Sequence, residues 1–323
     1  MANVSKIIGS LATAINKVSG SAISGLSKIM GATISLFSNT KSLSHGITSE
    51  VDFATAASTA SDFQLTEADA WSISFWIKPG WTSSLGTSTH LIASSEAGSS
   101  SAQDEMWRVY YNESNNRLYF GWRSASNQRS NNFIYFHNPG VNAAATISGL
   151  GNSFPSDNWT AAHPGYTNAN GFTLITLTKG TGTFATNSNW TAYWNSKDLG
   201  NPWYSSGNNN GTPDLTDSVA RKFSIGNKSW DNKNNMNGAA TLYDEVSLWN
   251  VELSQAQVAA IWNGTDAVGA EDGVPLNLQD PPSPLNSDNL IGYWRFETDG
   301  TVSTVGSATL TLGGDVESVT SPA

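Results

Sequence analysis

The 323-residue sequence contains no cysteine and little charge. Without cysteine the chain has no disulfide framework, no thiol nucleophile and no Cys-based zinc site. Charged residues make up 13% of the sequence, and 16 Lys and Arg against 26 Asp and Glu give a formal net charge of −10. Because no run of Lys and Arg is present, we expect no nucleic-acid partner and no binding to an anionic membrane surface.

A long apolar run is also missing. The N-terminal apolar stretch is interrupted by Gly9, Ser10 and Thr13, whereas a helix that spans a bilayer needs about 20 consecutive apolar residues. The same interruptions make this stretch a poor match to a signal peptide. We therefore expect no membrane partner.

Aromatic residues are abundant, with 13 Trp, 12 Phe and 9 Tyr, and much of the chain alternates between apolar and polar residues. This alternation is typical of strands that bury one face. We predict an all-β fold, an antiparallel two-sheet sandwich. The strand patterns cover residues 71–78, 106–111, 117–123, 172–179, 190–194, 222–226, 241–249 and 290–297, with a hairpin at about 301–312.

One short helix is predicted after residue 253. Ser254 is placed as the N-cap with Gln257 three residues later, which is the spacing of a capping box. Leu253 and Val258 occupy the positions of a hydrophobic staple. Gly264 is the expected C-terminal stop.

An 11-residue repeat occupies the N-terminus, with copies at Val4–Gly9, Ile15–Gly20 and Leu26–Gly31. This period is compatible with a right-handed helical supercoil or with a chain of short helical turns, each ended by its glycine. Neither form buries its own apolar side chains, so we expect the arm to pack on other chains or on its own domain. The side chains in question are Val4, Ile7, Ile15, Val18, Leu26 and Ile29.

The predicted organisation has four parts. They are an N-terminal repeat arm at 1–46, a sandwich at 47–263, a Pro-rich linker at 264–289, and strands at 290–323 that return to the sandwich. Within the sandwich, residues 124–171 form an insertion far longer than a hairpin needs, and loops of that length are usually functional or carry structure of their own.

The strand motifs resemble one known family. They are Trp71–Pro79, Phe172–Lys179, Thr191–Asn195, Phe223–Gly226 and Leu242–Ser254, the last containing Asp-Glu-Val ahead of a Leu-Ser-headed helix. In this order they are similar to the laminin-G-like branch of the concanavalin A-like lectin/glucanase jelly rolls. The resemblance covers about residues 47–263 and implies a jelly-roll sandwich.

The resemblance also bears on cofactors and chemistry. Relatives often hold a structural calcium with the Asp that opens the Asp-Glu-Val strand, which implies Asp244 as a Ca²⁺ ligand here. The alternative, in which Asp244 bonds to nearby backbone, has equal weight. Glycosidases of the superfamily carry a Glu-x-Asp-x-x-Glu strand, and this sequence has none. We expect no catalytic residues and no enzyme activity.

Glycan binding is the other expectation, because aromatic faces and polar amides together hold sugars. Most tryptophans fall in strand patterns and are expected in the core. Six residues in loops have the required character, although for each of them packing under the insertion carries more weight. They are Trp159, His163, Tyr166, Trp203, Tyr204 and Trp230.

The repeat arm resembles the N-terminal arms of tailed-phage (cyanophage-like) virion surface proteins. We therefore predict a non-enzymatic virion structural protein, made in the host cytoplasm and located on the particle surface as a capsid decoration or appendage. The arm would attach it to the major capsid protein or another virion protein, or join it into a homo-oligomer. The alternative is a carbohydrate-binding module of a phage tail or bacterial surface that recognises host glycans.

Overall fold

A computed structural model describes part of the chain. The described residues are 28–29, 32–33, 41–45, 54–58, 65–78, 88–96, 105–112, 117–124, 127–137, 168, 170–199, 203–204, 221–226, 241–263, 273–297, 310–312 and 317–320. The chain divides into two compact units, Met1–Ser38 and Asn39–Ala323. In the described part, no helix is both long and apolar enough to cross a membrane.

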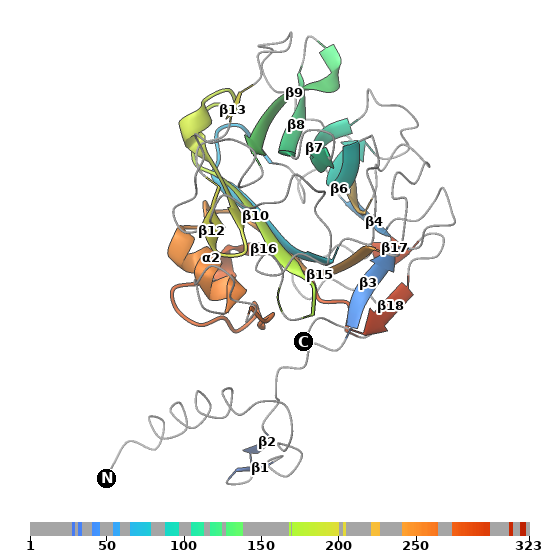
Figure 1. Cartoon of the computed structure of the whole chain (residues 1–323), viewed down its shortest axis with the longest axis vertical. Coiled ribbons are helices and arrows are strands. Elements are labelled where there is room, and N and C mark those ends of the chain that lie inside the picture. The colour runs from blue at the N-terminus through green and yellow to red at the C-terminus, as the bar shows by residue number, and fades with distance from the viewer. Residues whose placement is uncertain are drawn as a thin grey trace. The chain divides into compact units, whose positions relative to one another are not determined.

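The larger unit contains two antiparallel sheets (Figure 1). We call the first the helix-side sheet. Its strands, in spatial order, are β12 (Lys197–Asp198), β11 (Trp190–Trp194), β10 (Thr173–Lys179), β5 (Trp71–Lys78), β15 (Thr241–Trp249), β3 (Lys41–His45) and β18 (Glu317–Thr320), with β16 (Leu290–Trp294) also paired to β15. Short 3₁₀ turns at Asn187–Asn189 and Ser287–Asn289 lead into β11 and β16.

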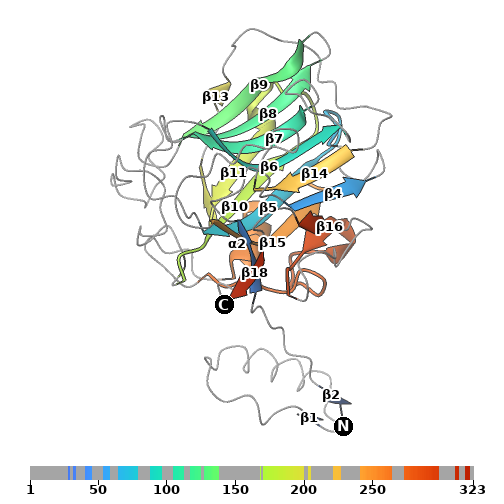
Figure 2. The ribbon, with the colours of Figure 1, turned by 90° about the vertical axis from the view of Figure 1, so that its right-hand side faces the viewer.

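We call the second the tyrosine sheet, and Figure 2 shows its central strands side by side. Its order is β13 (Trp203–Tyr204), β9 (Asn127–His137), β8 (Arg117–Ser124), β7 (Glu105–Asn112), β6 (Ser88–Glu96), β14 (Arg221–Ile225), β4 (Ala54–Ser58) and β17 (Leu310–Leu312). Every pairing in both sheets is antiparallel. The predicted fold class, an all-β jelly-roll sandwich with one short helix, is confirmed.

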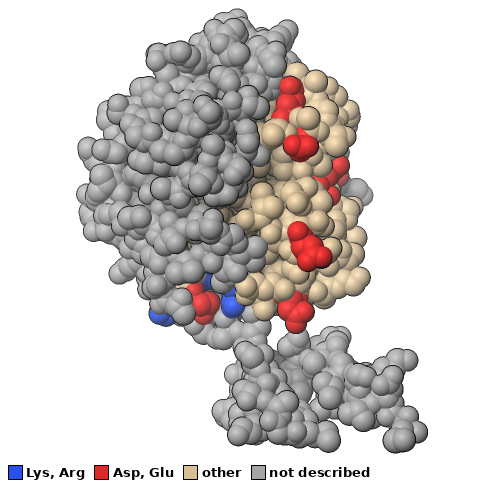
Figure 3. Space-filling model, turned by 180° about the vertical axis from the view of Figure 1, so that it is seen from behind, with Lys and Arg blue, Asp and Glu red and all other residues tan. Residues whose placement is uncertain are grey.

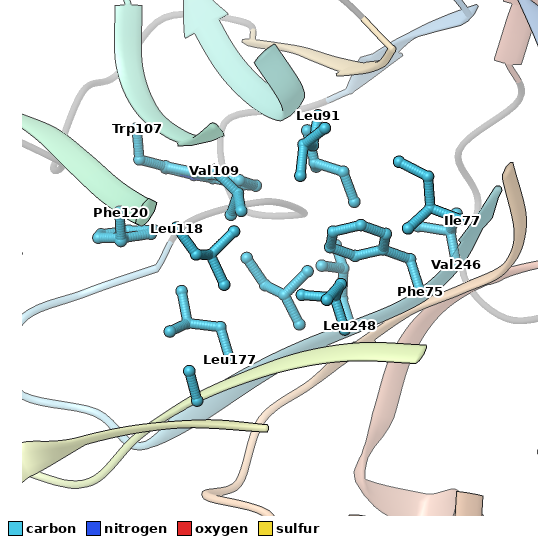
Figure 4. Close-up of a cluster of buried hydrophobic side chains, with 14 of the residues drawn as sticks. Phe75, Ile77, Leu91, Trp107, Val109, Leu118, Phe120, Leu177, Val246 and Leu248 are labelled. Atoms are coloured by element: carbon cyan, nitrogen blue, oxygen red, sulfur yellow. The ribbon is translucent and has the colours of Figure 1, made fainter. Parts of the chain in front are cut away.

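The main core lies between the two sheets. Because side chains alternate between the two faces of a strand, Ile73, Phe75 and Ile77 of β5 lie in this core, while Trp76 lies on the opposite face of the same strand. Figure 4 shows these side chains meeting residues from the tyrosine sheet. Six tryptophans predicted to be core residues are each at most 2% exposed: Trp71, Trp76, Trp107, Trp122, Trp249 and Trp294.

A second apolar cluster covers the outer face of the helix-side sheet. Helix α2 (Gln255–Trp262) contributes Val258, Ile261 and Trp262 to it, and the segment 273–290 contributes Leu278, Leu285 and Leu290. The capping box of α2 is present as predicted, because the Ser254 side chain accepts from the Gln257 backbone while the Gln257 side chain accepts from the Ser254 backbone. The sheet is thus buried on both faces.

Several segments differ from the prediction. Residues 41–45, assigned to the arm, form β3, and residues 273–289, assigned to a linker, pack on the second cluster. The long insertion predicted at 124–171 contains β9, whose Asn-rich start lacks the alternating pattern of a strand. Asn263, with φ 49°, takes the left-handed C-cap position expected of Gly264. Of the expected hairpin at 301–312, only β17 at 310–312 is described, and the rest lies outside the described residues.

The smaller unit contains one described feature. Strands β1 (Lys28–Ile29) and β2 (Ala32–Thr33) pair antiparallel, with Lys28 opposite Thr33 and Ile29 opposite Ala32. These residues lie in and just after the third repeat copy, where we expected helical turns. The other attachment candidates, Val4, Ile7, Ile15, Val18 and Leu26, lie outside the described residues.

Candidate functional site

A line of tyrosines crosses the outer face of the tyrosine sheet. Tyr110 of β7 lies directly opposite Tyr119 of β8, which lies directly opposite Tyr135 of β9. Their neighbours along the strands, such as Val109, Phe120 and Ile134, belong to the core, so alternation places the tyrosines on the other face. We call these three residues the tyrosine row.

The rings of the row are in contact with one another. Tyr110 and Tyr119 stack, with ring centroids 4.6 Å apart and an interplanar angle of 10°. Tyr119 and Tyr135 are tilted by 43° at 5.4 Å, and Phe133 meets Tyr119 edge-on at 5.2 Å. Such pairs stabilise sheets beyond the area they bury. Tyr110 and Tyr119 are each 6% exposed, and Tyr135 and Phe133 are partly exposed.

One arginine lies at each side of the row. The Arg108 guanidinium carbon is 4.5 Å from the centre of the Tyr110 ring, and that of Arg117 is 4.2 Å from the centre of the Tyr135 ring. At these distances the positive charge is attracted to the ring face. Arg108 is opposite Gly121, whereas Arg117 is opposite Asn112 and His137, so the two arginines flank the row from opposite sides.

Gly121 gives Arg108 the space it occupies. A Cβ atom added to Gly121 would lie 3.3 Å from Nε of Arg108 and 3.5 Å from the ring of Tyr110. The distance to Arg108 is tight, whereas that to the Tyr110 ring is an ordinary van der Waals contact, so a larger residue at this position would press on Arg108. The glycine therefore lets the arginine lie across β8, beside the row.

Two of the predicted glycan-binding residues neighbour the row. Trp203 and Tyr204 form β13, and Trp203 is directly opposite Tyr135 while Tyr204 is opposite Ile134. The sheet thus brings Trp203 into line with the tyrosine row on a fourth adjacent strand. The other four candidates, Trp159, His163, Tyr166 and Trp230, lie outside the described residues.

The row itself was not among the predicted site residues. The alternating pattern predicts strands, and the aromatic residues predicted to contact glycans lie in loops. A signal was nevertheless available, since Arg108, Tyr110, Arg117 and Tyr119 stand at alternate positions of two strands joined by a short turn. Alternation puts such residues on one face. Only the β9 partner, Tyr135, was hidden within the predicted insertion.

Asp244, the predicted calcium ligand, is fully buried in β15. Its Oδ1 accepts the backbone N–H of Glu245 at 2.8 Å, and its Oδ2 accepts the Ser42 hydroxyl at 3.5 Å. Ca²⁺ takes six to eight oxygen ligands, whereas no group of three or more His, Asp or Glu side chains suited to a metal occurs among the described residues. These two contacts fit a carboxylate that braces β3 against β15, which was the alternative to a calcium ligand.

Asp244 and Glu245 lie where β15 changes neighbours. Thr241–Tyr243 pair with β3, whereas Val246–Trp249 pair with β16. On the opposite edge, Asp244 faces Trp76 and Ser247 faces Ser74, so β15 carries an extra residue here. Glu245 has a φ of 46°, as is common in a bulge. This bulge turns the Glu245 side chain toward β16.

Glu245 is buried among groups of β16. The Tyr293 hydroxyl donates to its Oε2, and Nε of Arg295 lies 3.6 Å from its Oε1. Burial raises the pKa of Glu245 to about 8, although the Tyr293 hydrogen bond and the Arg295 charge both act to lower it. A carboxyl group that is 2% exposed is inaccessible to a large substrate, so this cluster has a structural role.

Lys179 is another buried charge with a structural role. Its Nζ donates to the carbonyl oxygens of Glu67 at 2.6 Å, Asp69 at 3.1 Å and Gly180 at 2.7 Å. Burial lowers the pKa of Lys179 to about 8, opposed by the charges of Glu67, Asp69 and Glu252. Three carbonyls match the three donors of an ammonium group, so Lys179 ties the segment before β5 to the end of β10.

Comparison with known proteins gives structural similarities only. No family model matches the sequence, and no curated protein matches it. A protein from Bacteroides ovatus assigned to carbohydrate binding is similar in structure, with a TM-score of 0.46 and 10% identity over 93% of this chain and 67% of that chain.

Two other solved structures are similar. The first is a heptameric SAP-like pentraxin from Limulus polyphemus, with a TM-score of 0.40 and 12% identity over 86% of this chain and 97% of that chain. The second is the binding domain of botulinum neurotoxin DC in complex with SialylT, with a TM-score of 0.33 and 18% identity over 61% of this chain and 36% of that chain. These scores and identities are low, so none of the three similarities supports an argument about function.

Proposed function

We propose that the sandwich is a non-enzymatic carbohydrate-binding module whose ligand lies along the tyrosine row. The observation that carries this proposal is the direct cross-strand line of Tyr110, Tyr119 and Tyr135 between Arg108 and Arg117. Tyrosine combines an apolar ring edge with a hydroxyl that donates and accepts hydrogen bonds, and arginine adds fixed N–H donors. Sugars present the matching combination of C–H surface and hydroxyl groups.

The row is rigid before any ligand arrives. Its rings stack on one another, its arginines rest on ring faces, and all of them stand on paired strands. Side chains that are already ordered lose little conformational entropy on binding, and this raises affinity. Sites built on strands are also more accurately placed than sites on loops.

The size of the row fits a short oligosaccharide. Neighbouring strands lie about 4.8 Å apart, so the four positions from Tyr110 to Trp203 span roughly 14 Å. Trp203, which we predicted as a glycan contact, extends the row by one strand. We infer that a ligand of several sugar units would run across the strands, from β7 to β13.

Binding of the full-length chain to a glycan array tests this proposal, with Tyr119→Ala as the test variant. Tyr193→Ala is a matched control, because Tyr193 is also 6% exposed but lies in the other sheet. We expect saturable binding that Tyr119→Ala weakens by about tenfold or more and Tyr193→Ala leaves in place, with circular dichroism showing both variants folded. Equal losses in the two variants, no bound glycan, or release of reducing ends from a bound glycan would each contradict the proposal.

We further propose that the protein is a virion component displayed on a tailed-phage particle and attached to capsid or other virion proteins. The observations behind this are the three repeat copies and the division of the chain at residue 38. Several apolar side chains of the repeat, at about 25 cal/mol per Å² of buried surface, would suffice for attachment.

Deletion of residues 1–38 tests the attachment. The shortened protein should fold and bind glycan but should no longer co-purify with particles, whereas the Tyr119→Ala variant should still do so. Retention of the deleted form on particles would contradict an attachment role for the arm.

A further inference from the structure

The arginines of the chain are concentrated in strands β7, β8 and β9, which carry the tyrosine row. Of the six arginines in the sequence, four lie between residues 105 and 137: Arg108, Arg117, Arg123 and Arg129. The same range contains no lysine and two acidic residues, Glu105 at the start of β7 and Glu113, which follows β7 in the sequence. In a chain of net charge −10, strands β7–β9 therefore form a positive region.

The described part of the face in Figure 3 contrasts with this region. On the face shown in Figure 3, Asp and Glu side chains of described residues are scattered among uncharged ones, with few Lys or Arg. Opposite charges on separate surfaces direct a charged ligand toward the surface of complementary sign. A negative ligand would accordingly be favoured at the tyrosine row and disfavoured elsewhere.

From this distribution we infer that the ligand of the tyrosine row is an anionic glycan, with its acid group held by Arg117 or Arg108. This inference rests on the proposed carbohydrate binding and specifies its ligand class. The acid group is a carboxylate or a sulfate ester, which share the planar or forked oxygen acceptors that a guanidinium binds with two parallel hydrogen bonds.

The geometry of both arginines suits this role. Each guanidinium lies over a tyrosine ring, at 4.5 Å for Arg108 and 4.2 Å for Arg117. Stacking on a ring uses the face of the guanidinium, whereas its N–H donors point outward in its own plane. Both side chains are partly exposed. The Nε atoms of both arginines are buried, so an acid group at the edge of the row would meet the terminal Nη donors without displacing the stack.

Position along the row adds specificity. Arg117 and Arg108 flank the row from opposite sides, so a ligand that runs along the row has a guanidinium on either side. Gly121 keeps Arg108 close to the Tyr110 ring, since a Cβ at residue 121 would lie 3.3 Å from Arg108 Nε. We expect Gly121→Val to displace Arg108 and lower the preference for acidic over neutral glycans.

The test compares glycans of equal length that differ only in charge. Calorimetry with the full chain would use three tetrasaccharides: one of neutral hexoses, one with uronic acid units and one that is sulfated. A single-stranded oligonucleotide is the anion that is not a glycan. The measured quantity is the ratio of acidic to neutral affinity at low salt. We expect a ratio of about ten or more, which falls toward one as salt rises, because the Debye length is about 3 Å at 1 M.

The variants are Arg117→Gln and Arg117→Lys, with Lys197→Gln as a control on the edge strand β12 of the other sheet. Arg117→Gln should bring the ratio close to one, Arg117→Lys should keep part of it, and Lys197→Gln should leave it unchanged. Stronger binding of the carboxylated or of the sulfated glycan identifies which acid is recognised.

The possible failures are distinguishable. Tyr119-dependent binding of neutral and acidic glycans with equal affinity would overturn the inference but leave the proposed function intact. No binding of any glycan would overturn both. Arg117-dependent binding of the oligonucleotide that exceeds all glycan binding would also overturn the inference, because aromatic rows with arginine can hold single-stranded nucleic acid.

Discussion

Trp76 of β5 and Trp262 of α2 stack with ring centroids 5.1 Å apart and an interplanar angle of 15°. Gly273 lies so close to Trp262 that a Cβ there would be 2.3 Å from the Trp262 ring. Asn168 in turn donates to the Gly273 carbonyl oxygen at 3.0 Å. This arrangement joins the helix, the sheet and the segment after the helix into one packed layer.

Replacing Trp262 with alanine should destabilise the protein by about 3–5 kcal/mol, because a buried aromatic side chain is lost and a cavity remains. Chemical denaturation measures the free energy of unfolding. Val274→Ala is the control, since Val274 is 42% exposed and its truncation should change stability by less than about 0.5 kcal/mol. A Trp262 variant as stable as the control would show that α2 is not anchored by this stack.

The stability of the protein should depend on the ionisation of Glu245. Its pKa is raised from 4.5 to about 8 in the folded chain, so the folded state binds more protons than the unfolded state between these values. The contribution of Glu245 to the free energy of unfolding is complete below about pH 4.5, where the carboxyl is protonated, and is lost as pH rises through about 8. Glu245→Gln should flatten this part of the curve of unfolding free energy against pH.

Glu252→Gln serves as the control for this measurement, because Glu252 is exposed. Its curve should keep the slope of the unmodified protein between pH 4.5 and 8. If Glu245→Gln keeps that slope too, then the buried carboxyl does not titrate in this range.

Removal of calcium should leave the melting temperature unchanged. Two donors, the Ser42 hydroxyl and the Glu245 backbone N–H, already bond to the two carboxylate oxygens of Asp244. Thermal unfolding with excess chelator and with added Ca²⁺ measures this directly. A chelator-sensitive melting temperature that becomes insensitive in Asp244→Asn would instead establish the calcium site that the family resemblance implied.

Two N-terminal deletions should differ sharply in stability. Removing residues 1–38 leaves β3 in place, whereas removing residues 1–46 deletes β3, the strand with which β18 pairs, and leaves the start of β15 paired only with β5. Because β3 also contributes the fully buried Leu43, we expect the longer deletion to lose at least about 2 kcal/mol of unfolding free energy. Equal denaturation midpoints would contradict the assignment of residues 41–45 to the sandwich.

Strands and the helix were predictable where local pattern and burial agree. Trp71–Lys78 and Thr241–Trp249 were predicted with the bounds they have, because each has a continuous core face. The capping box at Ser254 is a local signal and was also confirmed. The start of β9 carries Asn, Gln, Arg and Ser instead of apolar residues, so its strand pattern is weak. This segment is a strand because it pairs with β8, and sequence alone does not reveal that pairing.

The candidate site was predictable only in part, for a different reason. Trp203 was chosen for its residue type, but its position opposite Tyr135 depends on pairing between segments far apart in the sequence. The same is true of the arginines, which form no run along the chain and come together only through the register of β7, β8 and β9. Cross-strand clusters of this kind require knowledge of strand order.

The strands nearest the two ends of the sandwich pair with each other in both sheets. In the helix-side sheet β3 pairs with β18, and in the tyrosine sheet β4 pairs with β17. During synthesis, the edges of β3 and β4 that pair with β18 and β17 therefore stay unpaired until residues 310–320 have left the ribosome. Open strand edges promote aggregation, so expression of chains that stop before residue 310 should yield insoluble protein, and chaperone demand should be highest just before those last strands emerge.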